Sequence, residues 1–220
     1  MSESLSDAMD WVELLRVHDR FQAEITVGML EDHDVPVRTY GGATTALPAI
    51  GLTDVRILDG GLAAWRSAGG SLATGPVTPP PGNAAVLHDD LYAGALPTLT
   101  AEQTLAADLT LLDARAPERF RGEVEPVDPV AGHIPGAKNL PSGKALADDG
   151  TFLSSDELNQ LLTGHGIARD ARLGAYCGSG VTAAITLAAL ATLGHQAALF
   201  PGSWSEWSSD PSRAVARGSE

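Results

Sequence analysis

Residues 173–182 read LGAYCGSGVT, an apolar run that leads directly into a loop with two glycines and the only cysteine of the chain, Cys177. Residues 173–176 predict a buried strand. The apolar residues 181–193, which are followed by Gly194, predict a buried helix that ends at a glycine C-cap. A strand that turns through a short loop into a helix is typical of parallel α/β sheets, in which helices connect neighbouring strands.

The alternation of strand and helix continues on both sides of this stretch. Residues 110–113 (TLLD) and 197–200 (AALF) predict two further strands. Ser154 and Glu157 form a capping-box pattern, which predicts that a helix begins there. We therefore predict an α/β fold with parallel sheets in three-layer domains.

A shorter copy of the same pattern precedes a proline-rich stretch. Residues 35–42 (VPVRTYGG) mirror the strand and loop at Cys177, and residues 55–65 mirror residues 197–207, so that Gly60 and Trp65 match Gly202 and Trp207. We interpret this as a tandem duplication whose first copy is incomplete. Residues 1–73 would form a truncated, non-catalytic domain, residues 74–97 a proline-rich linker and residues 98–220 the catalytic domain.

Composition narrows the classes of partner. Among 220 residues, 14 Lys and Arg stand against 28 Asp and Glu, a net charge of −14, so we expect no nucleic acid partner. One cysteine and six scattered histidines predict no disulfide framework, no metal and no cofactor. The acidic N-terminus and the absence of an apolar run of about 18 residues predict no secretory signal and no membrane span, and hence a cytoplasmic protein.

The loop at Cys177 favours chemistry at sulfur. Backbone N–H groups at the start of a helix converge on one point and, with the helix dipole, stabilise a thiolate or a bound anion. A buried structural cysteine is the alternative. A phosphatase loop would need an arginine six residues after the cysteine, and position 183 is alanine. Attack of the thiolate on a sulfane sulfur, which gives a persulfide, is therefore favoured.

Four motifs in this order resemble the rhodanese superfamily, and most of all the second, catalytic domain of tandem thiosulfate and 3-mercaptopyruvate sulfurtransferases. They are residues 113–123 (DARAPERFRGE), 132–137 (GHIPGA), 177–182 (CGSGVT) and 202–207 (GSWSEW). The resemblance implies that Cys177 carries the persulfide and that Arg115 and Arg119 bind a small anionic donor. It also implies that amides surround the outer sulfur, from Gly178, Ser179, Gly180, Val181 and Thr182.

Several expectations follow from this resemblance. The neutral Gly178 and Ser179 favour mercaptopyruvate over thiosulfate as donor, and the acceptor would be a thiol or cyanide. Asp113 and His133 are expected to fasten loops rather than to act in catalysis. The shortened first copy predicts reduced activity, because the site of two-domain relatives lies between the domains. The alternatives are a non-catalytic persulfide carrier or regulatory binding module, and a truncated gene product without a selected role. The oligomeric state is left open.

Overall fold

The computed structural model describes residues 58–72, 90, 92 and 97–219. The chain divides into two compact units, Met1–Arg56 with Trp65–Leu87, and Ile57–Ala64 with His88–Glu220. Most of the proposed linker and the strand predicted within residues 35–42 lie outside the described residues. The tandem duplication, the domain boundaries and the incomplete first copy therefore stay predictions.

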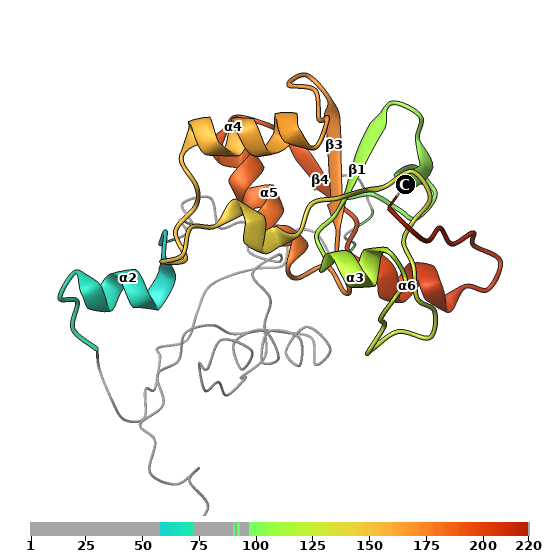
Figure 1. The fold of residues 1–220 in the computed structure, drawn as a ribbon, viewed down its shortest axis with the longest axis horizontal. Helices are drawn as coiled ribbons and strands as arrows, with labels where there is room; N and C mark the ends of the chain where they lie inside the picture. Colours follow the sequence, from blue (N-terminus) through green and yellow to red (C-terminus); the bar gives the residue numbers. More distant parts are fainter. Residues whose placement is uncertain (1–57, 73–89, 91, 93–96, 220) are drawn as a thin grey trace, which may run out of the picture. The chain divides into compact units, whose positions relative to one another are not determined.

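The second unit is built on a four-stranded sheet in the order β2-β1-β3-β4, in which every neighbouring pair is parallel (Figure 1). The strands are β1 (Leu109–Asp113), β2 (Lys138–Asn139), β3 (Arg172–Tyr176) and β4 (Ala197–Leu199). Three of them are the strands expected from the sequence, so the parallel α/β prediction is confirmed. The fourth, β2, was not predicted because two residues without an apolar run carry no strand signal.

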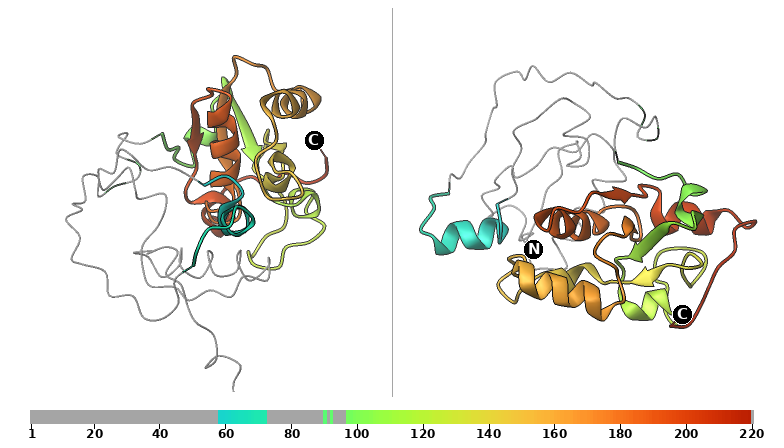
Figure 2. Two further views of the ribbon diagram at one scale, coloured as in Figure 1. Left: turned by 90° about the vertical axis from the view of Figure 1, so that its left-hand side faces the viewer. Right: turned by 90° about the horizontal axis from the view of Figure 1, so that it is seen from above.

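Helices cover both faces of this sheet. In Figure 1 and in the right-hand view of Figure 2, α4 (Ser155–Gly164) and α5 (Ala183–Thr192) lie on one side of the strands. The short helices α3 (Pro117–Phe120) and α6 (Ser203–Ser209) lie on the other. Two 3-10 helices, Gln103–Leu105 and Ser142–Ala145, lie in the connections. The three-layer arrangement is confirmed in this unit.

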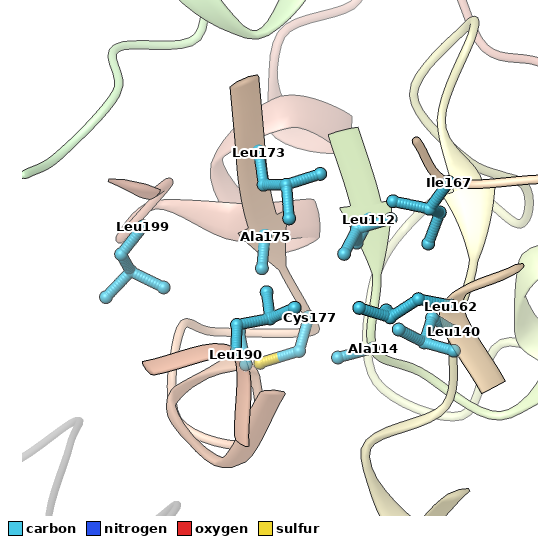
Figure 3. Packing of buried hydrophobic residues seen from close by; sticks show 11 residues of the cluster. Leu112, Ala114, Leu140, Leu162, Ile167, Leu173, Ala175, Cys177, Leu190 and Leu199 are labelled. Atoms are coloured by element: carbon cyan, nitrogen blue, oxygen red, sulfur yellow. The ribbon is translucent and has the colours of Figure 1, made fainter. Parts of the chain in front are cut away.

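Alternation along the strands sorts the core into two layers. Successive side chains of a strand point to opposite faces of the sheet. Leu112, Leu173 and Ala175 accordingly pack with the side chains of α4 and α5, as Figure 3 shows for part of this cluster. On the opposite face, Leu111 and Tyr176 pack with Phe120, Trp204 and other buried side chains. Every strand side chain named here is at most 2% exposed.

The helix ends follow the predicted capping chemistry. The Ser154 hydroxyl accepts a hydrogen bond from the Glu157 amide, and the Glu157 carboxylate accepts one from the Ser154 amide, which completes the capping box of α4. Gly194 follows α5 with φ +82°, the left-handed conformation that glycine adopts at low cost. The α5 helix begins at Ala183, two residues after the predicted start, because Val181 and Thr182 still belong to the cysteine loop.

Helix α2 (Gly61–Ser67) follows Gly60, the glycine that we matched to Gly202 ahead of α6. The burial of the two helices differs: α2 contains no buried residue, whereas α6 buries two tryptophans. Within the second unit, the Phe152 amide donates a hydrogen bond of 2.8 Å to the Asp59 carboxylate, just ahead of α2. Among the described residues, no helix combines the length and apolar character that crossing a bilayer requires.

Candidate functional site

The cysteine loop lies at the carboxyl end of β3, in the middle of the sheet. Asp113, at the end of β1, pairs in register with Tyr176, at the end of β3. The Ala114 amide donates to the Tyr176 carbonyl at 2.8 Å, so the segment after β1 runs beside Cys177. Ligand sites of open parallel sheets lie at this edge, where the chain leaves the strands. The loop therefore occupies the position expected of a binding site.

Helix α6 anchors the loop through its carbonyl groups. The Trp204 amide donates to the carbonyl of Cys177 at 3.0 Å, and the Ser205 amide donates to the carbonyl of Gly178 at 2.9 Å. The Ser205 hydroxyl also donates to the Gly178 carbonyl, at 2.9 Å. The Cys177 amide donates to the hydroxyl of Ser203 at 3.2 Å. The first turn of α6 thus fixes the orientation of the first two peptide groups of the loop.

The amides of the loop are left without protein partners. Within the described part of the chain, no backbone N–H group of residues 178–182 donates a hydrogen bond to a protein acceptor. Unpaired donors of this kind are uncommon in folded proteins and favour an anionic guest at the start of a helix. These are the five amides that the resemblance implied, and their role in holding a sulfur anion stays a prediction.

Two residues hold the backbone in conformations that few side chains allow. Gly180 has φ +86°, and a Cβ atom there would lie 2.6 Å from the carbonyl oxygen of Pro201, so only glycine fits. Ser203 has φ +53° and is fully buried. Its hydroxyl donates to the Phe200 carbonyl at 2.9 Å while it accepts from the Cys177 amide. Sequence reasoning missed Ser203 as a residue that positions the loop, although it lies within the GSWSEW motif.

The thiol of Cys177 does not face the loop amides openly. The residue is 2% exposed and belongs to the aliphatic cluster of the α4 and α5 face. Figure 3 shows its sulfur on the side of Leu190. Alternation explains this difference from the expectation, because Cys177 continues the series of Leu173 and Ala175 on the same face of β3. In this structure the sulfur is shielded from bulk water.

Arg119 lies against the cysteine loop. The Nη1 atom of its guanidinium is 3.5 Å from the position that a Cβ atom would take on Gly178. The side chain is 21% exposed and forms ion pairs with Glu125 at 2.5 Å and Asp128 at 3.4 Å. Arg119 therefore lies beside the cysteine loop with a partly exposed side chain, and its binding of a donor stays a prediction.

Arg115 lies elsewhere, inside the protein. Its guanidinium donates to Asp113 through two nitrogens, to Glu125 at 3.2 Å and to the Gly132 carbonyl at 2.7 Å, and it lies 4.6 Å from the centre of a Trp204 ring. Burial opposes the charged form, but the hydrogen bond and charge of Asp113 hold the pKa of Arg115 above its usual value. These internal partners occupy the guanidinium of Arg115 in this structure, and its binding of a donor stays a prediction.

The residues predicted to fasten loops do so. Asp113 accepts hydrogen bonds from the amide and guanidinium of Arg115 and is completely buried. His133 Nδ1 lies 2.7 Å from the Phe120 carbonyl, and its ring stacks on the Phe120 ring with 3.6 Å between centroids. Burial and the charge of Asp113 raise the pKa of Tyr176 well above 10, so its hydroxyl stays neutral. In the described residues, no cluster of three or more acidic, histidine or cysteine side chains could hold a metal ion.

Comparisons with known proteins identify the family of the chain. The rhodanese-like domain family matches residues 98–210. "Putative thiosulfate sulfurtransferase SseB" of Mycobacterium tuberculosis is 64% identical over 194 residues, which are 84% of this chain and 68% of that protein. The 3-mercaptopyruvate sulfurtransferase of Escherichia coli is 38% identical over 165 residues, 73% of this chain and 58% of that one. The crystal structure of YnjE superposes with a TM-score of 0.68 at 26% identity, covering 98% of this chain and 57% of that one.

The fold and the site together define a class of protein. Its members have a three-layer domain with a parallel sheet and an anchored cysteine loop at the carboxyl edge of that sheet. The chain belongs to the rhodanese-like family and, by its relatives, to the sulfurtransferases within it. It spans less than two thirds of the length of the Escherichia coli enzyme and of YnjE.

Proposed function

We propose that this protein transfers a sulfane sulfur from a small anionic donor, 3-mercaptopyruvate or thiosulfate, to a thiol or to cyanide through a persulfide on Cys177. The names of the SseB relative and of the Escherichia coli relative support these two donors. The observation that carries the proposal is the placement of the only thiol of the chain at the start of a loop beside the Arg119 guanidinium, a loop with five amides that have no partner among the described residues.

In the first half-reaction the Cys177 thiolate attacks the transferable sulfur of the donor. With thiosulfate, an S–S bond forms at Sγ while the S–S bond of the donor breaks, and sulfite leaves with the electron pair. With 3-mercaptopyruvate, the C–S bond breaks and its electron pair moves to carbon, and the resulting enolate takes up a proton and leaves as pyruvate. Arg119 would hold the sulfonate or carboxylate, and the loop amides would hold the outer sulfur of the persulfide.

In the second half-reaction an acceptor thiolate or cyanide attacks the outer sulfur. The bond between the two sulfurs breaks, and its electron pair returns to Cys177 as the thiolate. A thiol acceptor leaves as a persulfide, and cyanide leaves as thiocyanate. Neither half-reaction requires an external oxidant or a cofactor, because sulfur is transferred without net oxidation of the protein.

Of the two donors, we propose that 3-mercaptopyruvate is preferred. The loop residues next to Cys177, Gly178 and Ser179, bring no positive charge to match a dianion. Within the described residues, Arg119 is the one arginine seen beside the loop with a partly exposed side chain. A single carboxylate needs fewer cationic partners than a doubly charged donor.

Intact mass spectrometry tests the function directly. The purified protein is incubated with each donor in turn, and we expect the mass of one added sulfur atom, which is lost on addition of cyanide or a reducing thiol. Cys177→Ser is the matched control, and because no other cysteine exists it should gain nothing. A wild-type protein that stays unmodified with both donors, while its folded state is intact, contradicts the proposal.

The engagement of Arg115 by internal partners favours a second candidate, a persulfide carrier that does not use free donors, because it leaves Arg119 as the one arginine seen beside the loop in the described residues. At 2% exposure, Cys177 needs a movement of its side chain or loop before any donor reaches the sulfur. Incubation with a low-molecular-weight persulfide separates the two functions. A carrier gains sulfur from the persulfide but from neither mercaptopyruvate nor thiosulfate, whereas the enzyme gains it from a free donor. The reduced activity that the shortened first copy predicts depends on residues outside the described part.

A further inference from the structure

We propose that Asp128 is a specificity-determining residue, which weakens the hold of Arg119 on anionic donors and does so most for donors with two negative charges. The inference rests on the proposed function, since it concerns how donors reach the same loop. Sequence reasoning did not single out Asp128, which lies in the irregular segment between α3 and β2 where no periodic pattern marks it.

The geometry brings Asp128 to the cation of the site. Arg119 approaches Gly178 of the cysteine loop, and its Nη2 atom lies 3.4 Å from the Asp128 carboxylate. The side chain of Asp128 is 6% exposed, so bulk water screens its charge only weakly. A donor anion that binds Arg119 beside the loop therefore meets the field of this carboxylate.

Glu125 also pairs with Arg119, but both oxygens of its carboxylate already accept hydrogen bonds from protein donors. One oxygen accepts from Arg115 and from Nε of Arg119, and the other accepts from Nη2 of Arg119 and from the amides of Val127 and Asp128. Asp128 contacts Arg119 at 3.4 Å through one carboxylate oxygen and also has a hydrogen bond with the Ser205 side chain. Glu125 therefore positions the arginine, and Asp128 is the partner that a donor anion can replace.

The charge balance explains the sign of the effect. Arg115 and Asp113 neutralise each other in the interior, which leaves Arg119 with two carboxylates and a local sum of −1. Burial, and to a smaller degree the charge of Glu125, raise the pKa of Asp128, while the Ser205 hydroxyl and Arg119 oppose this. A neutral side chain at position 128 makes the local sum zero and removes the repulsion between the Asp128 carboxylate and an anion bound at Arg119.

The size of the effect depends on the charge of the donor. A Coulomb energy is proportional to the product of the two charges, so a dianion feels about twice the energy change that a monoanion feels. The fold-change in kcat/KM for a dianionic donor is therefore about the square of that for a monoanionic donor. If Asp128→Asn raises kcat/KM about tenfold for mercaptopyruvate, which has one carboxylate, it raises kcat/KM about a hundredfold for thiosulfate at low salt. The gain should appear in KM and should shrink as salt is added.

The experiment measures sulfur transfer from both donors to cyanide with the full chain, for wild type, Asp128→Asn and a matched control. Asp170→Asn is the control, because it removes the same charge from an exposed residue ahead of the opposite, amino end of β3. Asp128→Ser is a second neutral variant for the case that the asparagine variant folds poorly. Thermal unfolding confirms which variants are folded.

A larger gain for thiosulfate than for mercaptopyruvate in folded Asp128 variants, with Asp170→Asn unchanged, is the expected result. Equal changes for both donors, or no change, in a folded variant overturn this inference and leave the proposed function standing. Wild type and variants that all fail to form a persulfide, as read by intact mass, refute the proposed function, and the inference fails with it.

Discussion

Arg115→Met decides between the donor-binding role that the sequence implied and the internal role that the structure shows. Arg115 is the buried cationic partner of Asp113, which is completely enclosed. Removing one partner of a buried ion pair leaves an uncompensated charge and typically costs about 3–5 kcal/mol. For a protein of this size, each kcal/mol lowers Tm by about 2–4 °C, so we expect a fall of about 6–20 °C.

Urea unfolding followed by tryptophan fluorescence measures this loss, because the Arg115 guanidinium lies over a Trp204 ring at 4.6 Å. Arg121→Met is the matched control. Arg121 lies in the same segment but pairs with Glu123 at the surface, so its variant should unfold with the wild type. The double variant Asp113→Asn with Arg115→Met removes both charges and should regain part of the stability.

A specific result would refute the internal role of Arg115. If Arg115→Met unfolds with the wild-type midpoint but requires much more donor to form the persulfide, the guanidinium binds the donor after all. If the double variant is no more stable than Arg115→Met alone, the cost does not come from an unpaired Asp113 carboxylate.

Two further predictions concern the cysteine loop and the α6 region. Gly180→Ala should lower the unfolding free energy by about 2 kcal/mol or more and abolish persulfide formation, because φ is +86° and the new Cβ would lie 2.6 Å from the Pro201 carbonyl oxygen; wild-type thermal unfolding and mass gain would contradict it. Burial, with the charge of Glu206, raises the pKa of Tyr92 to about 12. The unfolded chain loses this proton near pH 10, so stability falls between pH 10 and 12, and Tyr92→Phe should lack that part of the fall. The unfolding free energy of both proteins is measured by urea titration at several pH values between 10 and 12. The same dependence on pH in wild type and Tyr92→Phe would exclude this contribution of Tyr92.

The features of the fold that depend on local patterns could be predicted from the sequence. Apolar runs marked β1, β3 and β4, and the Ser154 capping box and Gly194 marked the ends of helices. These signals depend on neighbours along the chain. The strand β2 has no such signal, because it is only two residues long, Lys138 and Asn139, and contains no apolar run.

The candidate site could be predicted only in part, because its side chains interact over long distances in the sequence. The DAR and RFRG motifs indicated two arginines for the donor, and no local signal distinguishes the buried Arg115 from Arg119 beside the loop. What separates them is the pairing of β1 with β3, which places Asp113 and Arg115 inside the protein. Glu125 and Asp128 were missed for the same reason, since only the folded chain brings them to Arg119.

The side on which the Cys177 thiol lies follows from the alternation of side chains along β3. The unpaired amides of the loop follow from its backbone conformation. Parity turns the thiol toward the aliphatic face of β3, while α6 binds the first two carbonyls of the loop and leaves the following amides unpaired. These two features arise separately from the sequence. The proposed sulfur transfer at Cys177 needs the sulfur and the amides on the same side of the loop. The proposed persulfide would lengthen the side chain of Cys177 by one sulfur atom, so its outer sulfur would lie farther from Cβ than Sγ does. The amides would then act on the charged intermediate rather than on the resting thiol, which is consistent with a buried cysteine in an active loop.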